Sequence, residues 1–194
     1  TVWAGVWAYH WWLESNEGQP TAETLAIRRL YVYVVSLVTL AMLAVGFGVI
    51  VHIILREGYE SVVTLPVLVP TQSGLWRDAM KTSLAVLLVG GVGWWAHWHY
   101  SASRDLRSVI RQIYLYIFTL LGGFVTVLMS LGAILFGVLV WVMGVPEDEA
   151  ASAHFRFLPP AAASLSVGVG LWLYHWTVVQ REVDVSPLGE RSSR

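Results

Sequence analysis

Four long stretches of the sequence carry apolar residues on every face and are separated by short polar segments. They cover residues 30–55, 79–100, 113–143 and 161–179. Each has close to or above the about 20 residues that a helix needs to cross the ~30 Å hydrocarbon core of a bilayer. A membrane strand would alternate apolar and polar positions, whereas a membrane helix satisfies its backbone hydrogen bonds internally. The pattern therefore predicts an all-α fold, a polytopic transmembrane helical bundle with four full spans.

The N-terminal stretch "TVWAGVWAYHWW" is as apolar as these spans but has only twelve residues before Leu13 and Glu14. A helix of that length cannot cross the bilayer. The stretch also lacks the basic leading region and the cleavage site of a signal peptide. We therefore expect residues 1–13 to be a partial transmembrane helix of a preceding repeat. A re-entrant or interfacial helix is the alternative.

Arginine and lysine are distributed unevenly between the two sides that the four spans define. Eight of them lie in segments 13–29, 100–112 and 180–194, and the other four lie on the opposite side. Cytoplasmic loops of membrane proteins carry an excess of positive charge. We therefore expect a protein of the bacterial plasma (inner) membrane whose C-terminus, with a polar tail over residues 183–194, is cytoplasmic.

The helix starts and the helix ends repeat along the chain. "IRRLYVY" at residue 27 and "IRQIYLY" at residue 110 agree at four of seven positions, and two spans end in His97-Trp98 and His175-Trp176. The repeating unit is thus a two-helix hairpin, with complete copies over residues 27–104 and 110–182. "GVWAYHW" near the N-terminus agrees with "GLWLYHW" at residue 170 at five of seven positions, which is why the first helix is assigned to a preceding repeat.

With these helix starts and hairpins, the sequence resembles a family of bacterial membrane domains catalogued as domain of unknown function 5671. The resemblance rests on the helix starts "RRLYVYVVSLVTL" and "RQIYLYIFTLLGG" and on the hairpins that cover most of residues 27–182. It implies a helical membrane domain and brings no established activity, cofactor or catalytic residue. The residues themselves must therefore indicate the function.

Composition and charge exclude several classes of function. With 56% hydrophobic residues and a mean hydropathy of +0.61, the chain lies outside the range of soluble domains. The net charge of -1 lacks the basic surplus of nucleic-acid-binding proteins, and the absence of cysteine excludes thiol catalysis. Apart from Lys81, the spans contain no Asp, Glu, Lys or Arg. Ion-coupled transport normally needs charges within the membrane, so we do not expect an ion-coupled transporter. As a separate expectation, the protein is not an enzyme.

Three histidines occupy equivalent positions near the cytoplasmic ends of related helices. His10, His97 and His175 each precede a tryptophan. Neutral imidazole is a good axial ligand for haem or a chlorophyll-type pigment, and facing histidines in a bundle can hold such a cofactor. A histidine beside tryptophan also fits the interfacial belt without any cofactor, and this interpretation is the favoured one. His52, near the end of the first span, is a further candidate for a ligand or proton role.

Small residues recur at a spacing of four within several spans. Such stripes let helix backbones approach closely, which supplies van der Waals contact that lipid does not. Some of these stripes are expected to serve the fold itself. The last span has two stripes on neighbouring faces, which leave room for an outside partner. The predicted packing residues are Gly122, Thr126, Ser130, Ala133, Gly137, Ala44, Gly48, Ser164, Gly168, Ser166 and Gly170.

Arginine, tyrosine and tryptophan at the span ends are expected to anchor the helices in the lipid headgroups. Arginine can extend its guanidinium to phosphate, and aromatic rings prefer the interface. The predicted interface anchors are Arg28, Tyr31, Tyr33, Arg111, Tyr114, Tyr116, Trp98 and Trp176.

Packing stripes, an aromatic belt and spans almost without charge together indicate a non-enzymatic scaffold or accessory subunit of a larger membrane complex. Its expected partners are the lipid bilayer and other membrane subunits or further copies of itself. A haem- or chlorophyll-binding subunit that uses the histidines is the alternative, and lipid or small-solute handling is a weaker one.

Overall fold

The computed structural model describes residues 2–16, 21–63, 75–100, 102, 108–144 and 150–184. The described residues form helices, and no strand occurs among them, which confirms the predicted all-α fold. The helices are α1 (Val2–Asn16), α2 (Ala22–Val63), α3 (Leu75–Tyr100), α4 (Val109–Gln112), the π-helix η2 (Ile113–Leu121), α5 (Gly122–Val142), α6 (Ala151–His154), the 3-10 helix η3 (Phe155–Phe157) and α7 (Leu158–Asp184).

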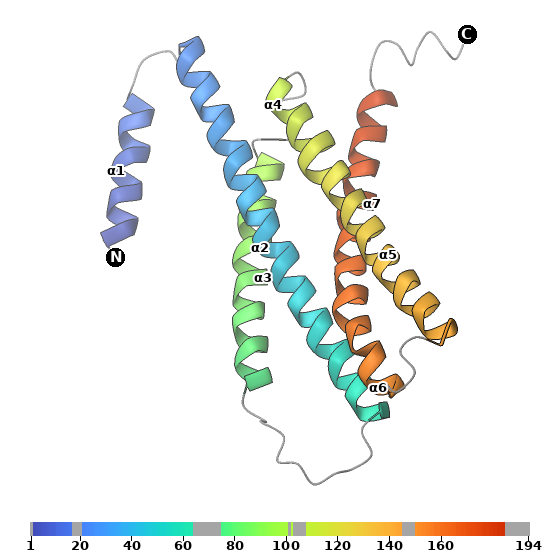
Figure 1. Ribbon diagram of the computed structural model, residues 1–194. Helices are drawn as coiled ribbons and strands as arrows, with labels where there is room; N and C mark the ends of the chain where they lie inside the picture. The colour runs from blue at the N-terminus through green and yellow to red at the C-terminus, as the bar shows by residue number, and fades with distance from the viewer. Residues whose placement is uncertain are drawn as a thin grey trace, which may run out of the picture.

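Four helical stretches are long and apolar enough to cross a membrane, which confirms the four predicted spans. They are Glu23–Val63, Trp76–His99, Val109–Val142 and Ala151–Arg181. Successive stretches run in opposite directions (Figure 1). We call the end where α2 begins, α4 lies and α7 ends the α4 end, and the end where α6 lies the α6 end. Of the arginines in the arginine-rich segments, the structure describes Arg28 and Arg29 near the start of α2, Arg111 in α4 and Arg181 near the end of α7, all of them at the α4 end.

The four long stretches form an open arrangement and not a closed bundle. Helix α2 packs on both α3 and α7, and α7 also packs on α5. Among the described residues, α3 and α5 make no comparable contact with each other. Helices α2 and α7 therefore form the middle, with α3 and α5 at the flanks.

Helix α1 lies beside the beginning of α2, to one side of the other helices (Figure 1). Each of its side chains that the structure describes is exposed. The helix continues to Asn16, three residues beyond the end predicted from the sequence. Its assignment to a preceding repeat stays a prediction.

Glycine makes the closest contacts between the long helices. A Cβ atom built on Gly46 would lie 2.6 Å from the backbone nitrogen of Leu87, so only glycine leaves room for α3 on α2 at this position. On the second pair of helices, a Cβ on Gly123 would lie 3.1 Å from the carbonyl oxygen of Gly168. These contacts bring the backbones of α2 and α3, and of α5 and α7, into direct contact.

The predicted packing stripes are only partly used. Gly168 lies at a helix contact, and Gly48 faces Val167 of α7. On α5, however, Gly123 contacts α7 in place of the predicted Gly122. Thr126 donates its hydroxyl to the carbonyl of Gly122 on its own helix at 2.8 Å. A sequence stripe cannot show which of two adjacent small residues faces the neighbouring helix.

The remaining members of these stripes have other surroundings. Ser130 is buried, whereas Ala133 and Ser164 are exposed. Gly137 accommodates the ring of Phe157, because any Cβ at this position would overlap that ring. This contact holds the short η3 helix against α5 at the α6 end.

The third span contains a π-helix that the sequence analysis did not predict. Its buried residues are Tyr114, Leu115, Thr119 and Leu120, so burial recurs at a spacing of five. A π-helix has i to i+5 hydrogen bonds, which places residues five apart on one face. The π-helix thereby turns Tyr114 and Thr119 toward the interior together.

Candidate functional site

Aromatic side chains and one histidine gather at the α4 end, and all of them except Trp94 and Tyr174 are buried. Tyr33 comes from α2, Trp94 and Trp98 from α3, Tyr114 from η2, and Tyr174 and His175 from α7; we call these six residues the aromatic cluster. Tyr114, Trp98 and His175 are only 2%, 3% and 1% exposed. Most of the buried apolar residues that the structure describes therefore lie at this end, where all four spans contribute.

Arg111 lies against Trp98 of this cluster and is 3% exposed. Its Nη1 donates a hydrogen bond to the carbonyl oxygen of Ala102, and the Tyr33 hydroxyl donates to the same oxygen at 3.4 Å. The guanidinium carbon lies 5.0 Å from the centre of the Trp98 ring, within the range of a cation–π contact. Arg111 thus joins the segment after α3 to the start of the third span.

The rings of the cluster make a set of stacked and edge-on contacts. Trp98 stacks on Trp94 and on Tyr114, with ring centres 6.3 and 5.3 Å apart. The Trp94 indole donates a hydrogen bond to the Tyr114 hydroxyl at 3.1 Å. His175 meets Trp94, Trp98 and Tyr114 edge-on at 6.4, 6.1 and 6.0 Å. These distances are typical of favourable aromatic pairs.

Four predicted interface anchors are therefore placed differently by the structure. Tyr33, Trp98, Arg111 and Tyr114 were expected to reach the lipid headgroups, and the structure instead buries them between helices. The physical reason is that hydrogen bonds and ring contacts within the protein satisfy their polar groups.

The other four predicted anchors remain at the surface. Tyr31 is 59% exposed, Tyr116 50% and Trp176 46%, and Arg28 is exposed as well. Their positions agree with an interfacial role. That role stays a prediction, since the structure contains no lipid.

His175 has one nitrogen satisfied and one without a partner. Its Nδ1 donates a hydrogen bond to the Leu171 carbonyl at 2.8 Å, because a carbonyl oxygen can only accept. In the neutral ring, Nε2 then carries the lone pair. This atom is buried and has no hydrogen-bond partner among the described residues. His175 therefore offers one unused acceptor in the interior.

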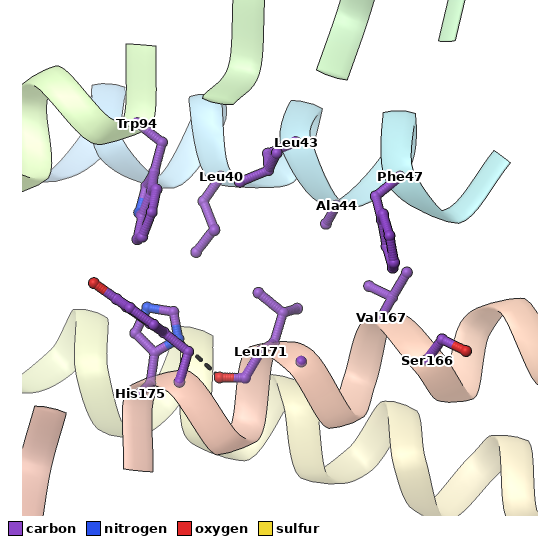
Figure 2. A pocket seen from close by; sticks show the side chains of 11 residues that line it. Leu40, Leu43, Ala44, Phe47, Trp94, Ser166, Val167, Leu171 and His175 are labelled. Atoms are coloured by element: carbon purple, nitrogen blue, oxygen red, sulfur yellow. Dashed lines mark hydrogen bonds between the residues drawn. The ribbon is translucent and has the colours of Figure 1, made fainter. Parts of the chain in front are cut away.

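A groove between α2 and α7 lies beside His175. It has a volume of about 300 Å³, and we call it the α2–α7 groove. Figure 2 shows Leu40, Leu43, Ala44 and Phe47 of α2 on one side and Val167 and Leu171 of α7 on the other. Trp94, Tyr174 and His175 close one end. The groove is almost entirely apolar (Figure 2), and the His175 Nε2 atom is itself buried.

The other predicted histidines do not join His175. His10 on α1 is exposed. His97 is half-buried, donates its Nδ1 hydrogen to the Gly93 carbonyl at 2.8 Å and has Tyr31 as its ring neighbour at 6.2 Å. Among these three histidines, only His175 is buried and lines the α2–α7 groove.

His52 lines a different cavity at the α6 end. This cavity has a volume of about 550 Å³ and is lined also by Arg56, Tyr59, Glu60 and Arg156. Arg56 forms an ion pair with Glu60 at 2.7 Å. His52 also lines an apolar groove of about 380 Å³, together with Ala44 and Ser164. Its Nδ1 atom, like Nε2 of His175, is buried without a hydrogen-bond partner among the described residues. In the described part of the chain, no group of three or more His, Asp or Glu side chains is placed to hold a metal ion.

Two residues of the site were not singled out as site residues from the sequence. These two residues are Trp94 on α3 and Tyr174 on α7. A partial signal existed, because Trp94 and Trp98, like Leu171 and His175, are four apart and share a helix face. Nothing in the sequence pairs the face of α3 with that of α7.

Residues 29–158 of the 194-residue chain match the model of a protein family described as "Domain of unknown function (DUF5671)". No curated protein matches the chain. No solved structure matches it either.

Proposed function

Because this chain belongs to the DUF5671 family, which is defined without a known activity, we propose a function from its own geometry: it is a non-enzymatic scaffold or accessory subunit of a larger membrane assembly. The observation that carries the proposal is the open arrangement of the four spans. Helices α3 and α5 lie at the flanks, each packed mainly on one neighbour. Their outer faces are available to further transmembrane helices.

Helix α5 offers the most suitable surface for a partner helix. Among its 21 residues only Gly123, Ser130 and Gly137 are buried. Gly132 lies on an exposed face, and a Cβ built on it would meet no described atom within 4 Å. A bare glycine backbone of this kind lets a second helix approach closely, which is the usual basis of helix association in lipid.

The proposed location is the bacterial plasma membrane, with the α4 end on the cytoplasmic side. Arg28, Arg29, Arg111 and Arg181 belong to that end. Positive charge near the ends of membrane spans favours the cytoplasmic side. The same orientation places the C-terminus in the cytoplasm.

A haem or chlorophyll-type pigment held by two facing histidines is supported less well. His175 has a neighbouring groove, but His97 lies beside Tyr31 and His10 is exposed on α1. An absorption spectrum of the purified protein tests this alternative. A Soret or long-wavelength band would favour it over a purely structural role.

A leucine at Gly132 tests the subunit role. In a blue-native gel of gently solubilised membranes, we expect the wild-type chain to migrate in a complex well above its own 21.6 kDa. We expect Gly132→Leu to release it as a smaller species, because the leucine side chain would prevent close helix approach. Gly58→Leu is the matched control, since Gly58 on α2 also has open space at its Cβ position. Migration of the wild type as a lone monomer would contradict the proposal.

A further inference from the structure

We infer that the polar cavity at the α6 end and the apolar groove that adjoins it bind one phospholipid with a net negative charge. The cavity holds the headgroup and the groove holds an acyl chain. We call them the α6-end cavity, which includes Arg56, Glu60 and Arg156 in its lining, and the His52 groove, which includes Val45, Val49 and Ser164. The site requires a chain that spans a membrane, and it does not require the subunit role.

The α6-end cavity lies at the depth of the lipid headgroups. Its lining comes from the end of α2, from α6 and η3, and from the start of α7, which lie together at the α6 end (Figure 1). The apolar run of residues 30–55 ends directly before Arg56, and the run of residues 161–179 begins directly after Pro160. These runs cover the hydrocarbon core, so the cavity lies just outside it. In the proposed orientation it belongs to the outer leaflet.

The charges of the cavity favour a phosphate group. Arg56 donates its Nε hydrogen to Glu60 at 2.7 Å, which compensates one positive charge and leaves the Nη groups of Arg56 as further donors. Arg156 makes no ion pair or hydrogen bond with another described residue. The lining therefore carries one uncompensated positive charge. Guanidinium groups bind phosphate oxygens strongly, often through two parallel hydrogen bonds.

A hydrogen bond between α2 and α6 holds the two arginine-bearing segments together. The Tyr59 hydroxyl donates to the carbonyl oxygen of Ser152 at 2.8 Å, and both residues line the cavity. Arg56 lies one turn before Tyr59 on α2, and Arg156 lies on η3, which directly follows α6. The two guanidinium groups are thus brought to one cavity from different parts of the chain.

The His52 groove continues from this cavity toward the middle of the membrane. His52 and Pro160 line both the cavity and the groove. On α2, Val45, Val49, His52 and Arg56 follow one another at a spacing of three or four, so they share one face of the helix. This face is apolar up to Val49 and polar from His52 onward. It therefore matches a molecule with a charged end and an apolar chain.

A phospholipid occupies both parts of the site at once. The cavity has a volume of about 550 Å³ and the groove about 380 Å³, and each lies within the range of small-molecule sites. A soluble anion would use only the cavity, and a neutral hydrocarbon only the groove. A choline headgroup would add a positive charge beside the two guanidinium groups, whereas a glycerol headgroup adds none.

Titration of the full chain with two phospholipids tests the inference. Dioleoylphosphatidylglycerol and dioleoylphosphatidylcholine have the same acyl chains, and only the first has a net negative charge. Native mass spectrometry of the chain in detergent micelles measures the affinity for the first lipid bound. We expect phosphatidylglycerol to bind about fivefold more tightly, the contribution of one arginine beside anionic lipid. Equal affinity of the wild type for the two lipids would overturn the inference.

Arg156→Gln tests the headgroup cavity, and we expect it to abolish the preference for phosphatidylglycerol. Arg77→Gln is the matched control and should keep the preference. Arg77 is also exposed and lies at the α6 end, at the start of α3, but it does not line the cavity. Both variants remove one exposed charge, so their folding should be little affected. An unchanged preference in Arg156→Gln, or an equal loss in both variants, would overturn the inference.

Ser164→Leu tests the groove, because the leucine side chain would fill part of it. We expect weaker binding of both lipids with an unchanged ratio. Ser166→Leu is the control, since Ser166 is likewise exposed on α7 but lines the α2–α7 groove instead. Wild-type affinity in Ser164→Leu, or an equal loss in Ser166→Leu, would overturn the inference. Displacement of phosphatidylglycerol by an equal concentration of glycerophosphoglycerol, the headgroup without chains, would also overturn it and would indicate a site for soluble anions.

Discussion

Gly90→Ala should lower the free energy of unfolding by about 1–3 kcal/mol, the usual effect of overpacking in a close-packed interior. Gly90 lies where α3 crosses α2. A Cβ at this position would overlap the backbone nitrogen of Leu43 and would lie 2.8 Å from the Thr39 carbonyl oxygen and 2.9 Å from the Met42 carbonyl carbon. These are backbone atoms, so no side-chain rotation can relieve the contact. The two helices must move apart, which also loosens the contact at Gly46.

Gly91→Ala is the matched control for this variant. Gly91 is the next residue on the same helix, and its Cβ would meet only the flexible end of the Leu43 side chain, at 3.5 Å. Alanine favours a helix over glycine by up to about 1 kcal/mol, so Gly91→Ala should be neutral or stabilising. Equilibrium unfolding of both variants in mixed micelles measures the difference. Equal effects of the two substitutions would mean that α2 and α3 are not packed as the structure describes.

Arg111→Met should also destabilise the protein, by about 1–3 kcal/mol, because it leaves a buried carbonyl without its main donor. The variant removes the hydrogen bond to Ala102 and the contact with the Trp98 ring. Methionine fills much of the same space, so the loss reports the polar contacts more than the packing. The same unfolding measurement applies. In addition, the segment after α3 should exchange its amide hydrogens faster once Ala102 is no longer held.

Two further substitutions distinguish this effect from a general loss of positive charge. Arg181→Met removes an exposed arginine at the same end of the bundle, and exposed substitutions usually change stability by about 0.5 kcal/mol or less. Arg111→Lys keeps the charge but loses the planar fork of donors, so an intermediate effect is expected. A result in which Arg181→Met is as destabilising as Arg111→Met would show that Arg111 acts as a surface charge, as an interface anchor would.

The paired tyrosines are a case in which the sequence does not indicate which side chain is buried. Tyr31 and Tyr33 were both predicted as anchors, yet Tyr33 is 4% exposed and Tyr31 59% exposed. In the third span the first tyrosine of the pair, Tyr114, is the buried one, and Tyr116 is exposed. Residues two apart point to nearly opposite sides of a helix. The sequence could not indicate which side, because the spans are apolar on every face and have no polar stripe to mark the lipid-facing surface.

The predicted repeat also does not indicate which of two equivalent side chains is buried. By its register Trp98 corresponds to Trp176 and His97 to His175. The structure buries Trp98 and His175 and leaves Trp176 46% exposed. Equivalent residues of the two hairpins therefore have different surroundings, since each hairpin faces a different neighbour. The two-helix repeat itself stays a prediction about how the sequence is built.

The sequence by itself determined the four helical spans, their alternating direction and the excess of arginine at one end. It could do so because a chain in lipid must satisfy its backbone hydrogen bonds within each segment, and length and composition express that requirement directly. Only the tertiary structure decided that Gly90 and Gly123 lie at the helix contacts, and that His175 is buried beside an apolar groove whereas His97 is not. Those outcomes depend on the rotation of each helix about its axis. Contacts between helices fix this rotation, and a uniformly apolar sequence does not encode it locally.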